Sequence, residues 1–402
     1  MEWKEVRLGE VADVQTGPFG SQLHKENYVN KGTPIVTVEH LGNKWFTSQN
    51  LPMVSDEDKL RLAKYCSQEG DVIFSRVGSV DRCSYVSKEY SGWLFSGRCL
   101  RVRPRSGINP EYLYYFLTNE GTKQYIRNIA VGATMPSINT KLLNEVPITI
   151  PSLDDQRRIV SILSSLDRKI ELNNKINADL EEMAQAIFKN WFVDFEPFKD
   201  GKFVDSELGM IPEGWKVGTL GDITKNKSAK VKERNDVKVL SPVTTGELVL
   251  SEEYFTKQVF SSSIAKYKIV NKGDFAYNPA RVNIGSLGRN EFDFDGCVSP
   301  VYVVFSVLDG YENYFDLFRN TDFFKDSVAS LAIGGVRQSL SYDDLCSIEV
   351  IIPSENAVEE FNNLYNQMKK TIKANKLENS RLSLLRDTLL PRLMSGELEV
   401  PE

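Results

Sequence analysis

The sequence contains few of the residues on which metal sites and disulfide frameworks depend. It has only two histidines, His24 and His40, among 402 residues. Its five cysteines are odd in number and no two of them form a C-x-x-C pair, a pattern that favours neither disulfides nor zinc. They stand far apart, at Cys66, Cys83, Cys99, Cys297 and Cys346. We therefore expect no metal site in this chain.

Long apolar runs are missing as well. No stretch approaches the roughly 18 consecutive apolar residues of a membrane span, and the opening residues MEWKEVRLGE lack the apolar segment of a signal peptide. A hydrophobic content of 41% with 26% charged residues is typical of a soluble globular protein. The sequence predicts a cytoplasmic protein with no membrane partner, and its length predicts two or more domains.

Sequence signatures of catalysis are also absent. The chain has no G-x-x-x-x-G-K-[ST] phosphate loop, no G-x-G-x-x-G after a strand and no G-x-S-x-G motif. The segment YNPARV (277–282) partly matches the Asn-Pro-Pro-aromatic motif of amino-methyltransferases, but the second proline and the aromatic residue are missing. We expect a binding protein with no catalytic residue and no cofactor of its own.

The chain repeats itself. EWKEVRLGEVADV at 2–14 matches EGWKVGTLGDI at 213–223, and GDVIFSRVGSV from Gly70 matches GDFAYNPARVNIGSLG from Gly273. GATMPSINTKLLNEVPITIPS from Gly132 matches GVRQSLSYDDLCSIEVIIPS from Gly335, so Pro151 and Pro353 are equivalent. Such internal similarity indicates two copies of one plan, a mixed domain followed by a helix.

Within each copy, short strands separated by Gly, Pro and Asn turns precede an amphipathic helix. Strand-like segments are PIVTVEHL, GDVIFSRV and WLFSGRCLRVRP in the first copy, and DVKVLSPV and SPVYVVFSV in the second. A helix is predicted over 109–130 and another over 312–332. Aromatic residues crowd one side of these helices, which favours a core role over base stacking.

Positive charge is concentrated in two stretches, although the net charge is −6. Residues 76–105 contain seven Lys or Arg against two Asp or Glu, and residues 225–238 contain six against two. The distribution of charge matters more than its sum for nucleic-acid binding. Each copy therefore has one candidate basic surface, and a solvated basic face explains either stretch equally well.

The segments after Pro151 and Pro353 predict two long helices. Ser152 and Asp155 form a capping box, so the first helix is expected to begin there and to run to about Phe192. A seven-residue count places one apolar seam along each helix, which is typical of a coiled coil. The predicted seam positions are Ile159, Leu166, Asn173, Leu180 and Ile187 in the first helix, and Phe361, Met368, Asn375, Leu382 and Leu389 in the second.

Asparagine interrupts both seams near the middle of the helix, at Asn173 and Asn375. A polar residue at such a position fixes the register of a coiled coil at some cost in stability, and the midpoints of two equal helices meet in either orientation. We therefore predict that the two helices pair with each other, antiparallel, so that the repeats are pseudo-twofold mates. The other interpretation is that both asparagines face solvent.

Several phrases along the chain resemble the specificity subunits of type I restriction-modification systems. They are GPFGS (17–21), GDVIFSRVGSVDR (70–82), IPSLDDQRRI (150–159), WFVDFEPF (191–198), LGMIPEGWKVGTLG (208–221) and LLPRLMSGEL (389–398). The resemblance covers the whole chain, and the order and spacing of the phrases make it specific. Departures fall in the second copy, where YNPARVNIGSLG replaces a strand followed by Arg-x-Gly and no Gln matches Gln156.

This resemblance implies an α+β chain with two target-recognition domains joined by two long helices that form an antiparallel coiled coil. The implied boundaries are 1–150 and 212–352 for the recognition domains, 151–194 and 353–396 for the helical spacer regions, and 195–211 for a linker. Each domain would read half of a bipartite target in double-stranded DNA. Two methyltransferase subunits carrying S-adenosylmethionine and ATP-dependent restriction subunits are the implied partners.

Base reading favours Arg for guanine and Asn or Gln for adenine, whereas Lys and Arg contacts to phosphate position a domain. Polar residues in and after the turns of each copy are the candidates. In the first domain they are Gln22, His24, Lys25, Arg76, Ser79, Arg82 and Thr134, and in the second Lys230, Arg281, Asn283, Arg289, Arg337 and Gln338. For every one of them, a surface ion pair or a turn role is the competing explanation.

Two other functions stay open at this point. The acidic net charge is compatible with a coiled-coil scaffold that does not bind DNA. A degenerate self-contained DNA methyltransferase or nuclease is the second alternative, and the missing cofactor turn argues against it.

Overall fold

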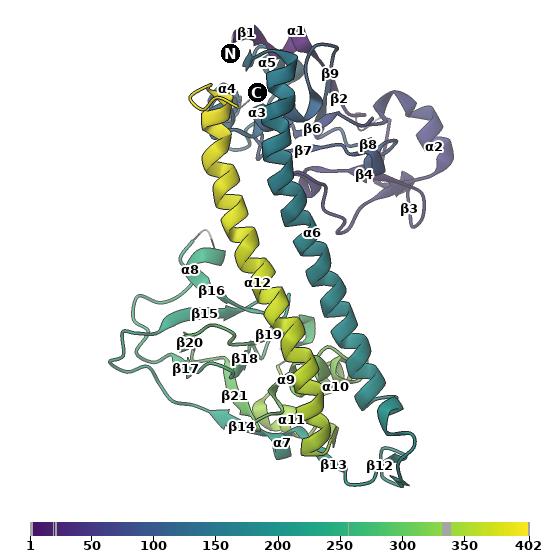
Figure 1. Cartoon of the computed structure of the whole chain (residues 1–402), viewed down its shortest axis with the longest axis vertical. Coiled ribbons are helices and arrows are strands. Elements are labelled where there is room, and N and C mark those ends of the chain that lie inside the picture. Colours follow the sequence, from purple (N-terminus) through teal and green to yellow (C-terminus); the bar gives the residue numbers. More distant parts are fainter. Residues whose placement is uncertain (1–2, 19, 21, 256, 332–338, 401–402) are drawn as a thin grey trace. The chain divides into compact units, whose positions relative to one another are not determined.

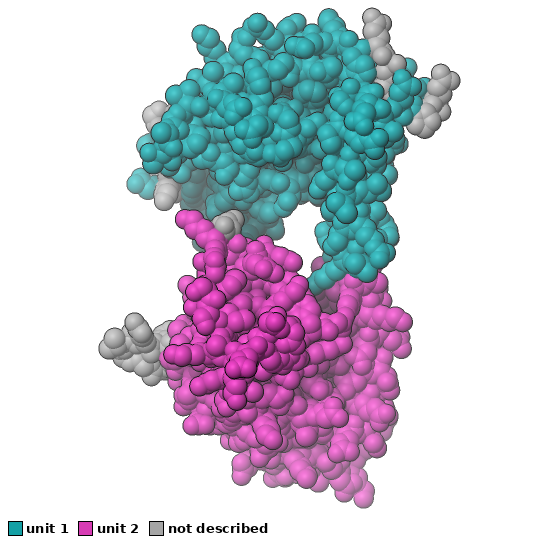
Figure 2. All heavy atoms as spheres, turned by 90° about the vertical axis from the view of Figure 1, so that its left-hand side faces the viewer, with its two compact units in different colours: residues 1–174, 376–402 teal, residues 175–375 magenta. Residues whose placement is uncertain are grey.

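The computed structural model describes residues 3–18, 20, 22–255, 257–331 and 339–400 (Figure 1). The chain forms two compact units, coloured separately in Figure 2. The first unit contains residues 1–174 together with 376–402, and the second contains residues 175–375. Each unit therefore includes one mixed α/β domain and part of both long helices.

The first unit is built on two four-stranded sheets and one strand pair. One antiparallel sheet has the order β2 (Ala12–Thr16), β9 (Cys99–Pro104), β6 (Val72–Ser75), β7 (Cys83–Tyr85). The other has the order β3 (Tyr28–Val29), β5 (Met53–Val54), β4 (Thr33–Val36), β8 (Leu94–Phe95), with β4 and β8 parallel. The strand pair is β1 (Lys4–Arg7) with β10 (Pro147–Ile150).

The second unit repeats this plan. Its sheets have the orders β14 (Thr224–Lys227), β21 (Val303–Val307), β18 (Phe275–Tyr277), β19 (Leu287–Arg289), and β16 (Leu248–Leu250), β15 (Lys238–Pro242), β20 (Gly296–Val298), β17 (Lys268–Val270). The pair β13 (Lys216–Thr219) with β22 (Glu349–Ile352) matches β1 with β10, and β11 (Phe203–Val204) with β12 (Ile211–Pro212) forms a hairpin before it. The sheet β14-β21-β18-β19 repeats the strand order of β2-β9-β6-β7. In the other sheet β16-β15-β20 repeats β5-β4-β8, but the fourth strand differs, because β17 lies beside β20 whereas β3 lies beside β5.

Helices in the two units also correspond. The α-helices of the first domain are α1 (Leu8–Val11), α2 (Asp56–Arg61), α3 (Pro110–Thr118), α4 (Glu120–Ile129) and α5 (Thr140–Asn144). Those of the second are α7 (Leu220–Ile223), α8 (Ser251–Tyr254), α9 (Glu312–Phe318), α10 (Asp322–Leu331) and α11 (Tyr342–Cys346). Single turns of 3-10 helix are η1 (Lys25–Asn27), η2 (Val38–His40), η3 (Ala63–Tyr65), η4 (Lys88–Tyr90), η5 (Glu196–Phe198) and η6 (Val282–Ile284).

The single helices predicted over 109–130 and 312–332 are wrong, because each is two helices. Asn119 has an extended backbone, and its side-chain oxygen accepts a hydrogen bond from the Gly121 amide at 3.1 Å, which starts α4. Asparagine favours such caps over a helix interior. In the second domain the Thr321 hydroxyl accepts from the Phe324 amide at 3.2 Å and starts α10.

Two long helices, α6 (Leu153–Phe192) and α12 (Glu355–Met394), have 40 residues each. This corresponds to about 60 Å at 1.5 Å per residue. The Asp155 amide donates to the Ser152 hydroxyl at 3.2 Å, so the predicted cap is present at the start of α6. After the end of α6, Phe195 has a φ of 54°, and its ring packs against Trp215 with centroids 5.5 Å apart. The aromatic phrase WFVDFEPF therefore forms the corner that ends α6.

The two long helices pair antiparallel, as the sequence predicts (Figure 1). In the first unit the Asn173 side-chain NH2 donates to Asn379 Oδ1 at 2.9 Å and to Glu378 Oε2 at 2.7 Å. In the second unit the Asn375 side-chain NH2 donates to Asn177 Oδ1 at 2.9 Å. Asn173 and Asn375 thus do not contact each other, because antiparallel packing matches each of them with a residue four places further along the partner helix.

The predicted seam residues lie on the facing sides of the helices. Ile159, Asn173, Phe361 and Met368 are buried, whereas Leu166, Leu180, Ile187, Asn375, Leu382 and Leu389 are half-buried. Ile159 and Leu389 pack with the core of the first domain, and Leu180, Ile187, Phe361 and Met368 pack with that of the second. The seam is therefore continuous with the core of each domain.

Equivalent hydrogen bonds attach each domain to the start of its helix. The Tyr112 hydroxyl donates to the Thr149 carbonyl at 2.7 Å, and the Tyr314 hydroxyl donates to the Ile351 carbonyl at 2.6 Å. The buried Gln156 donates to the Pro151 carbonyl at 3.0 Å and accepts from the Asn109 amide.

The second copy lacks this glutamine because Tyr311, the counterpart of Asn109, takes over its contact. The Tyr311 hydroxyl donates to the Pro353 carbonyl at 2.7 Å, and Pro353 is the counterpart of Pro151. Gln156 is therefore a structural residue, and its absence from the second copy leaves the attachment of the helix intact.

Replacing Asn375 alone by alanine is expected to destabilise the second unit. The substitution leaves Oδ1 of the buried Asn177 without its donor, and an orphaned buried polar group costs about 1–3 kcal/mol. Replacing Asn177 and Asn375 together by leucine removes both polar groups and is expected to be neutral or to raise the melting temperature. Calorimetric unfolding of the single and double variants measures this difference, and equal losses in both would contradict it.

Candidate nucleic-acid interface

In the first domain, loops that are distant in sequence are held together by backbone hydrogen bonds. The Arg76 amide donates to the Arg98 carbonyl at 2.8 Å, and the Ile138 amide donates to the Arg76 carbonyl at 2.9 Å. The Gly78 amide donates to the Pro136 carbonyl at 2.8 Å. The turn after β6 therefore lies between the turn before β9 and the loop 131–138, and we call these three segments the first loop cluster.

Gly17, in the phrase GPFGS, lies against the same turn. Its amide donates to the Cys99 carbonyl at 3.2 Å, and a Cβ at this position would lie 2.1 Å from the Ser96 carbonyl oxygen. Only glycine permits so close an approach of two backbones. The phrase thus starts the loop that carries the predicted residues from Gln22 onward.

The predicted residues of the first domain fall into three groups. Arg76, Ser79 and Thr134 lie in the first loop cluster, with Ser79 and Thr134 exposed. His24 is exposed, Lys25 is in η1 with its side chain outside the described atoms, and Gln22 accepts from the Tyr65 hydroxyl at 2.7 Å. Arg82 donates to the Leu41 carbonyl, which gives it a structural role.

Much of the basic stretch 76–105 is used inside the fold. Arg103 makes two hydrogen bonds of 2.7 Å to the buried Asp71, and Arg101 is 7% exposed beside it. Burial and the neighbouring Arg103 lower the pKa of Arg101. Arg105 pairs with Asp13 at 2.6 Å. The stretch therefore offers a partner far less positive charge than its sequence indicates.

The second stretch keeps more of its charge at the surface. Two of its cations are neutralised, since Lys227 pairs with Asp274 at 2.7 Å and Arg234 pairs with Asp236 at 2.6 Å and with Asp295 at 3.0 Å. Four others are exposed, at Lys225, Lys230, Lys232 and Lys238.

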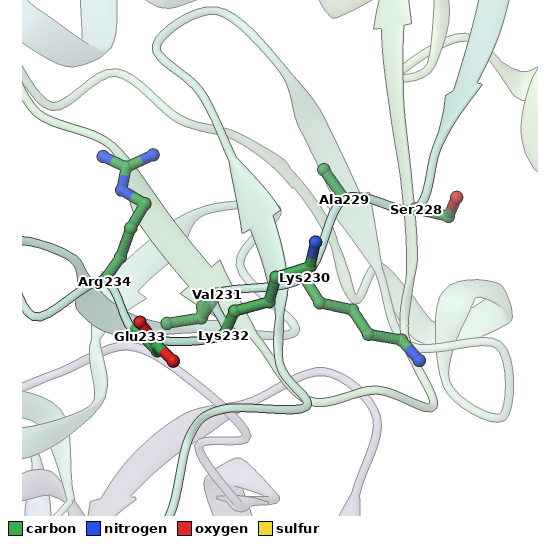
Figure 3. A pocket seen from close by; sticks show the side chains of 7 residues that line it. All are labelled: Ser228, Ala229, Lys230, Val231, Lys232, Glu233 and Arg234. Atoms are coloured by element: carbon green, nitrogen blue, oxygen red, sulfur yellow. The ribbon is translucent and has the colours of Figure 1, made fainter.

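Residues 228–234 line an open surface pocket that contains part of this charge (Figure 3). In this view the side chains of Lys230 and Arg234 extend to opposite sides of the loop. Lys230 and Lys232 make no ion pair within the part of the chain that the structure describes, so their charges are available to an anionic partner.

A second loop cluster mirrors the first. The Leu340 amide donates to the Pro279 carbonyl at 3.1 Å, as the Ile138 amide does to Arg76. A Cβ on Gly285, whose φ is 93°, would lie 2.7 Å from the Thr244 carbonyl oxygen. Arg281 and Asn283 are exposed between these contacts. The segment YNPARV thus forms a turn within this second loop cluster.

Of the other predicted residues of the second domain, Lys230 lies in the loop 228–234 and Arg289 lies on β19. Arg289 donates to Asn313 Oδ1 at 2.8 Å and lies over the Phe275 ring at 5.8 Å, which gives it a structural role. Arg337 and Gln338 lie outside the described residues.

The structure adds residues that the sequence did not single out. Arg98 is exposed in the first loop cluster, and Met135 is 66% exposed beside Thr134. Lys225, Lys232 and Lys238 are exposed near Lys230. For the four cations, the signal in the sequence was only their membership of the two basic stretches, and that membership does not separate exposed from internally paired cations. Met135 lies in neither stretch.

Within the described ranges, no group of three or more His, Cys, Asp or Glu side chains is arranged to hold a metal ion. Among those residues, no helix combines the length and the apolar character that crossing a membrane requires.

The arrangement is that of a duplicated DNA-specificity protein, with paired mixed domains and a helical coiled coil. The sequence model of the type I restriction modification DNA specificity domain matches residues 1–182. The MjaIX specificity subunit of Methanocaldococcus jannaschii is 30% identical, with 100% of this chain and 94% of that protein covered. The HindI specificity subunit of Haemophilus influenzae is 23% identical over 99% of this chain and 100% of that protein.

One solved structure has the same fold along its length. The S subunit of a type I restriction-modification system from M. genitalium superposes with a TM-score of 0.57 at 16% identity, and 100% of this chain and 96% of that chain are covered. This likeness shows the fold, and the sequence relatives show the family. The chain belongs to the specificity subunits of type I restriction-modification systems.

Replacing Arg76 by alanine is expected to weaken binding to the target because the side chain lies in the first loop cluster. Arg157→Ala is the matched control, since Arg157 is an exposed arginine on α6 paired with Asp154. Binding of labelled duplex at fixed salt compares the two variants. Equal affinity of Arg76→Ala and the control would remove Arg76 from the interface.

Lys230→Ala is expected to weaken binding to all duplexes alike, because a lysine that contacts phosphate carries no base preference. The slope of log affinity against log salt should fall by about 0.9, the value for one lost phosphate contact. Lys189→Ala, which removes an exposed lysine from the end of α6, is the control. An unchanged salt slope in Lys230→Ala would contradict the assignment.

Proposed function

We propose that this chain is the DNA-recognition subunit of a type I restriction-modification complex and that each of its domains reads one half of a bipartite target. The observation that carries the proposal is the duplication of the loop cluster, once around Arg76 and once around Arg281, on domains whose antiparallel sheets have the same strand order. Major-groove reading needs polar side chains on such loops, supported by cations that contact phosphate. The comparisons with known proteins do not favour the scaffold and the degenerate-enzyme alternatives.

The predicted boundaries at 150, 195, 212 and 352 belong to this proposal. The interface that we propose consists of Gln22, His24, Lys25, Arg76, Ser79 and Thr134 in the first domain, and Lys230, Arg281, Asn283, Arg337 and Gln338 in the second. Arg82 and Arg289 are left out because their guanidinium groups bond to Leu41 and Asn313, outside the loop clusters. Gln22 and Arg76 also make contacts within the first domain, with Tyr65 and with the Gly97 carbonyl, and they stay in the proposal because of their places in the loop after GPFGS and in the first loop cluster.

The chain acts in this proposal without chemistry of its own. Two methyltransferase subunits would carry S-adenosylmethionine, and restriction subunits would use ATP. The outer faces of the long helices suit the docking of other subunits, since Leu172, Leu377 and Leu384 are 53%, 54% and 70% exposed. Apolar side chains gathered outside a coiled-coil seam indicate a protein interface.

The long helices would set the spacing between the two halves of the target. A shift of one heptad along a helix is about 10 Å at 1.5 Å per residue. The same distance along DNA is about three base pairs, since one turn of about 10 base pairs measures roughly 34 Å. The asparagine pairs hold the register on which such a spacing depends.

Inserting one heptad after Lys175 in α6 and another after Leu377 in α12 is expected to lengthen the unread spacer of the target by about three base pairs. Both helices must be extended, because an insertion in one alone breaks the register. Mapping of methylated adenines in cells that hold the methyltransferase measures the spacer. A heptad in α6 alone is the control and should abolish methylation, whereas an unchanged spacer in the doubly extended chain would contradict the proposal.

A further inference from the structure

The two repeats carry opposite charges at one equivalent position of their long helices. Asp167 stands sixteen residues after Pro151, and Lys369 stands sixteen residues after Pro353. Thirty-three residues after the same prolines stand Ala184 and Arg386. All four lie where the helices contact a recognition domain or each other, so the inversion falls within the packed structure rather than on the outer surface.

In the first unit the helices offer a carboxylate to the domain. Asp167 accepts from the Tyr115 hydroxyl at 2.5 Å and from Arg386 at 2.8 Å, and the Lys44 ammonium lies 3.5 Å away. The side chains of Lys44 and Asp167 are both 6% exposed. Lys44, from the loop after η2, also pairs with Glu111 of α3 at 2.9 Å. The domain thus contributes a buried cation to a site on α6.

In the second unit the polarity is reversed. Asp316 of α9 is buried, pairs with Arg319 at 2.7 Å and lies 3.5 Å from the Lys369 ammonium. Burial acts to raise the pKa of Asp316, but the charges of Arg319, Lys369 and Arg289 outweigh it and hold that pKa below its ordinary value. Glu291 pairs with Lys369 as well. Here the domain contributes the carboxylates and the helix the cation.

Ala184 completes the difference between the two sites. It is 2% exposed in the core of the second unit, at the position where the other repeat places Arg386. At the second site α6 therefore supplies no guanidinium that could pair with a second carboxylate. A domain carrying Asp316 at the first site would bring its own Arg319 but would place Asp316 against Asp167, and one carrying Lys44 at the second would bring Glu111 but would place Lys44 against Lys369. Like charges that face each other in a buried site are destabilising.

We propose that positions 167, 386 and 369 form a charge key that admits each recognition domain only to its own site on the paired helices. The first site fits a domain that presents a buried cation, and the second fits one that presents a buried carboxylate. The inference rests on the proposed function only in regarding the two domains as recognition domains. The charge key concerns the attachment of each domain to the long helices, and this attachment is measurable without DNA.

The test uses a chimera in which residues 1–150 are replaced by a second copy of residues 212–352. Asp167→Lys with Arg386→Ala gives the first site the residues of the second. In the native chain this double substitution is expected to lower the melting temperature of the first unit by roughly 5–10 °C, because it breaks a buried ion pair. In the chimera the same substitutions are expected to raise the melting temperature, because they remove the mismatch with the second Asp316.

A charge key requires that the substitutions lower the melting temperature of the native chain and raise that of the chimera. General damage to the helices would lower the melting temperature of both chains. Asp154→Lys, at a side chain that is 76% exposed, is the matched control; it opposes the dipole at the start of α6 and should lower the melting temperature of both chains slightly and equally. Substitutions that destabilise both chains, or that leave the chimera unchanged, would overturn the inference.

A DNA measurement separates this inference from the proposed function. Together with methyltransferase subunits, the chimera with the exchanged key should methylate a target whose two halves both match the second domain. If the melting temperatures change sign as expected and no such target is methylated, the proposed function fails and the charge key stands.

Discussion

Two 40-residue helices with an apolar stripe on one side are unstable in water unless the stripes are covered. In this chain α6 and α12 cover each other, and the same seam continues at both ends into the cores of the two domains. The observed alignment gives the polar interruptions of the seam hydrogen-bond partners, since the Asn173 NH2 donates to Asn379 and the Asn375 NH2 donates to Asn177, although Asn173 Oδ1 is buried without a partner among the described residues. The position of every loop on a domain is set, through its own unit, by this alignment.

Each domain is attached to its helix by a few directional contacts rather than by apolar packing alone. Tyr112 and Tyr314 make the same hydrogen bond in the two units, whereas Gln156 and Tyr311 reach equivalent carbonyls from different positions of the chain. Conserving the contact while changing the residue lets two domains diverge in sequence without changing the angle at which they leave the helix. Two domains that would read different half-sites need such divergence in sequence.

The sequence predicted the repeat, the long helices and their antiparallel pairing because these depend on periodicity, and periodicity is visible in a single chain. It did not predict the break at Asn119, where a local cap competes with an otherwise helical pattern. The positive charge that the stretch 76–105 offers to a partner was overestimated for a related reason. Arg101 and Arg103 alternate with apolar residues on β9 and Arg105 follows the end of that strand, so the three side chains lie beside Asp71 or Asp13. Counting charges does not show such pairing, and for the same reason it did not separate the exposed lysines around Lys230 from the paired Lys227 and Arg234.

Both compact units share both long helices, and this has a consequence for the order in which the protein forms during synthesis. The core of the first unit includes Leu393, Met394 and Val400 beside Ile159 and Leu163. The ribosome has therefore to make the whole second unit before the first can be completed, and until then one side of α6 stays uncovered. Domains usually fold in the order of their synthesis, but here the earliest part of the chain waits for residues 376–400.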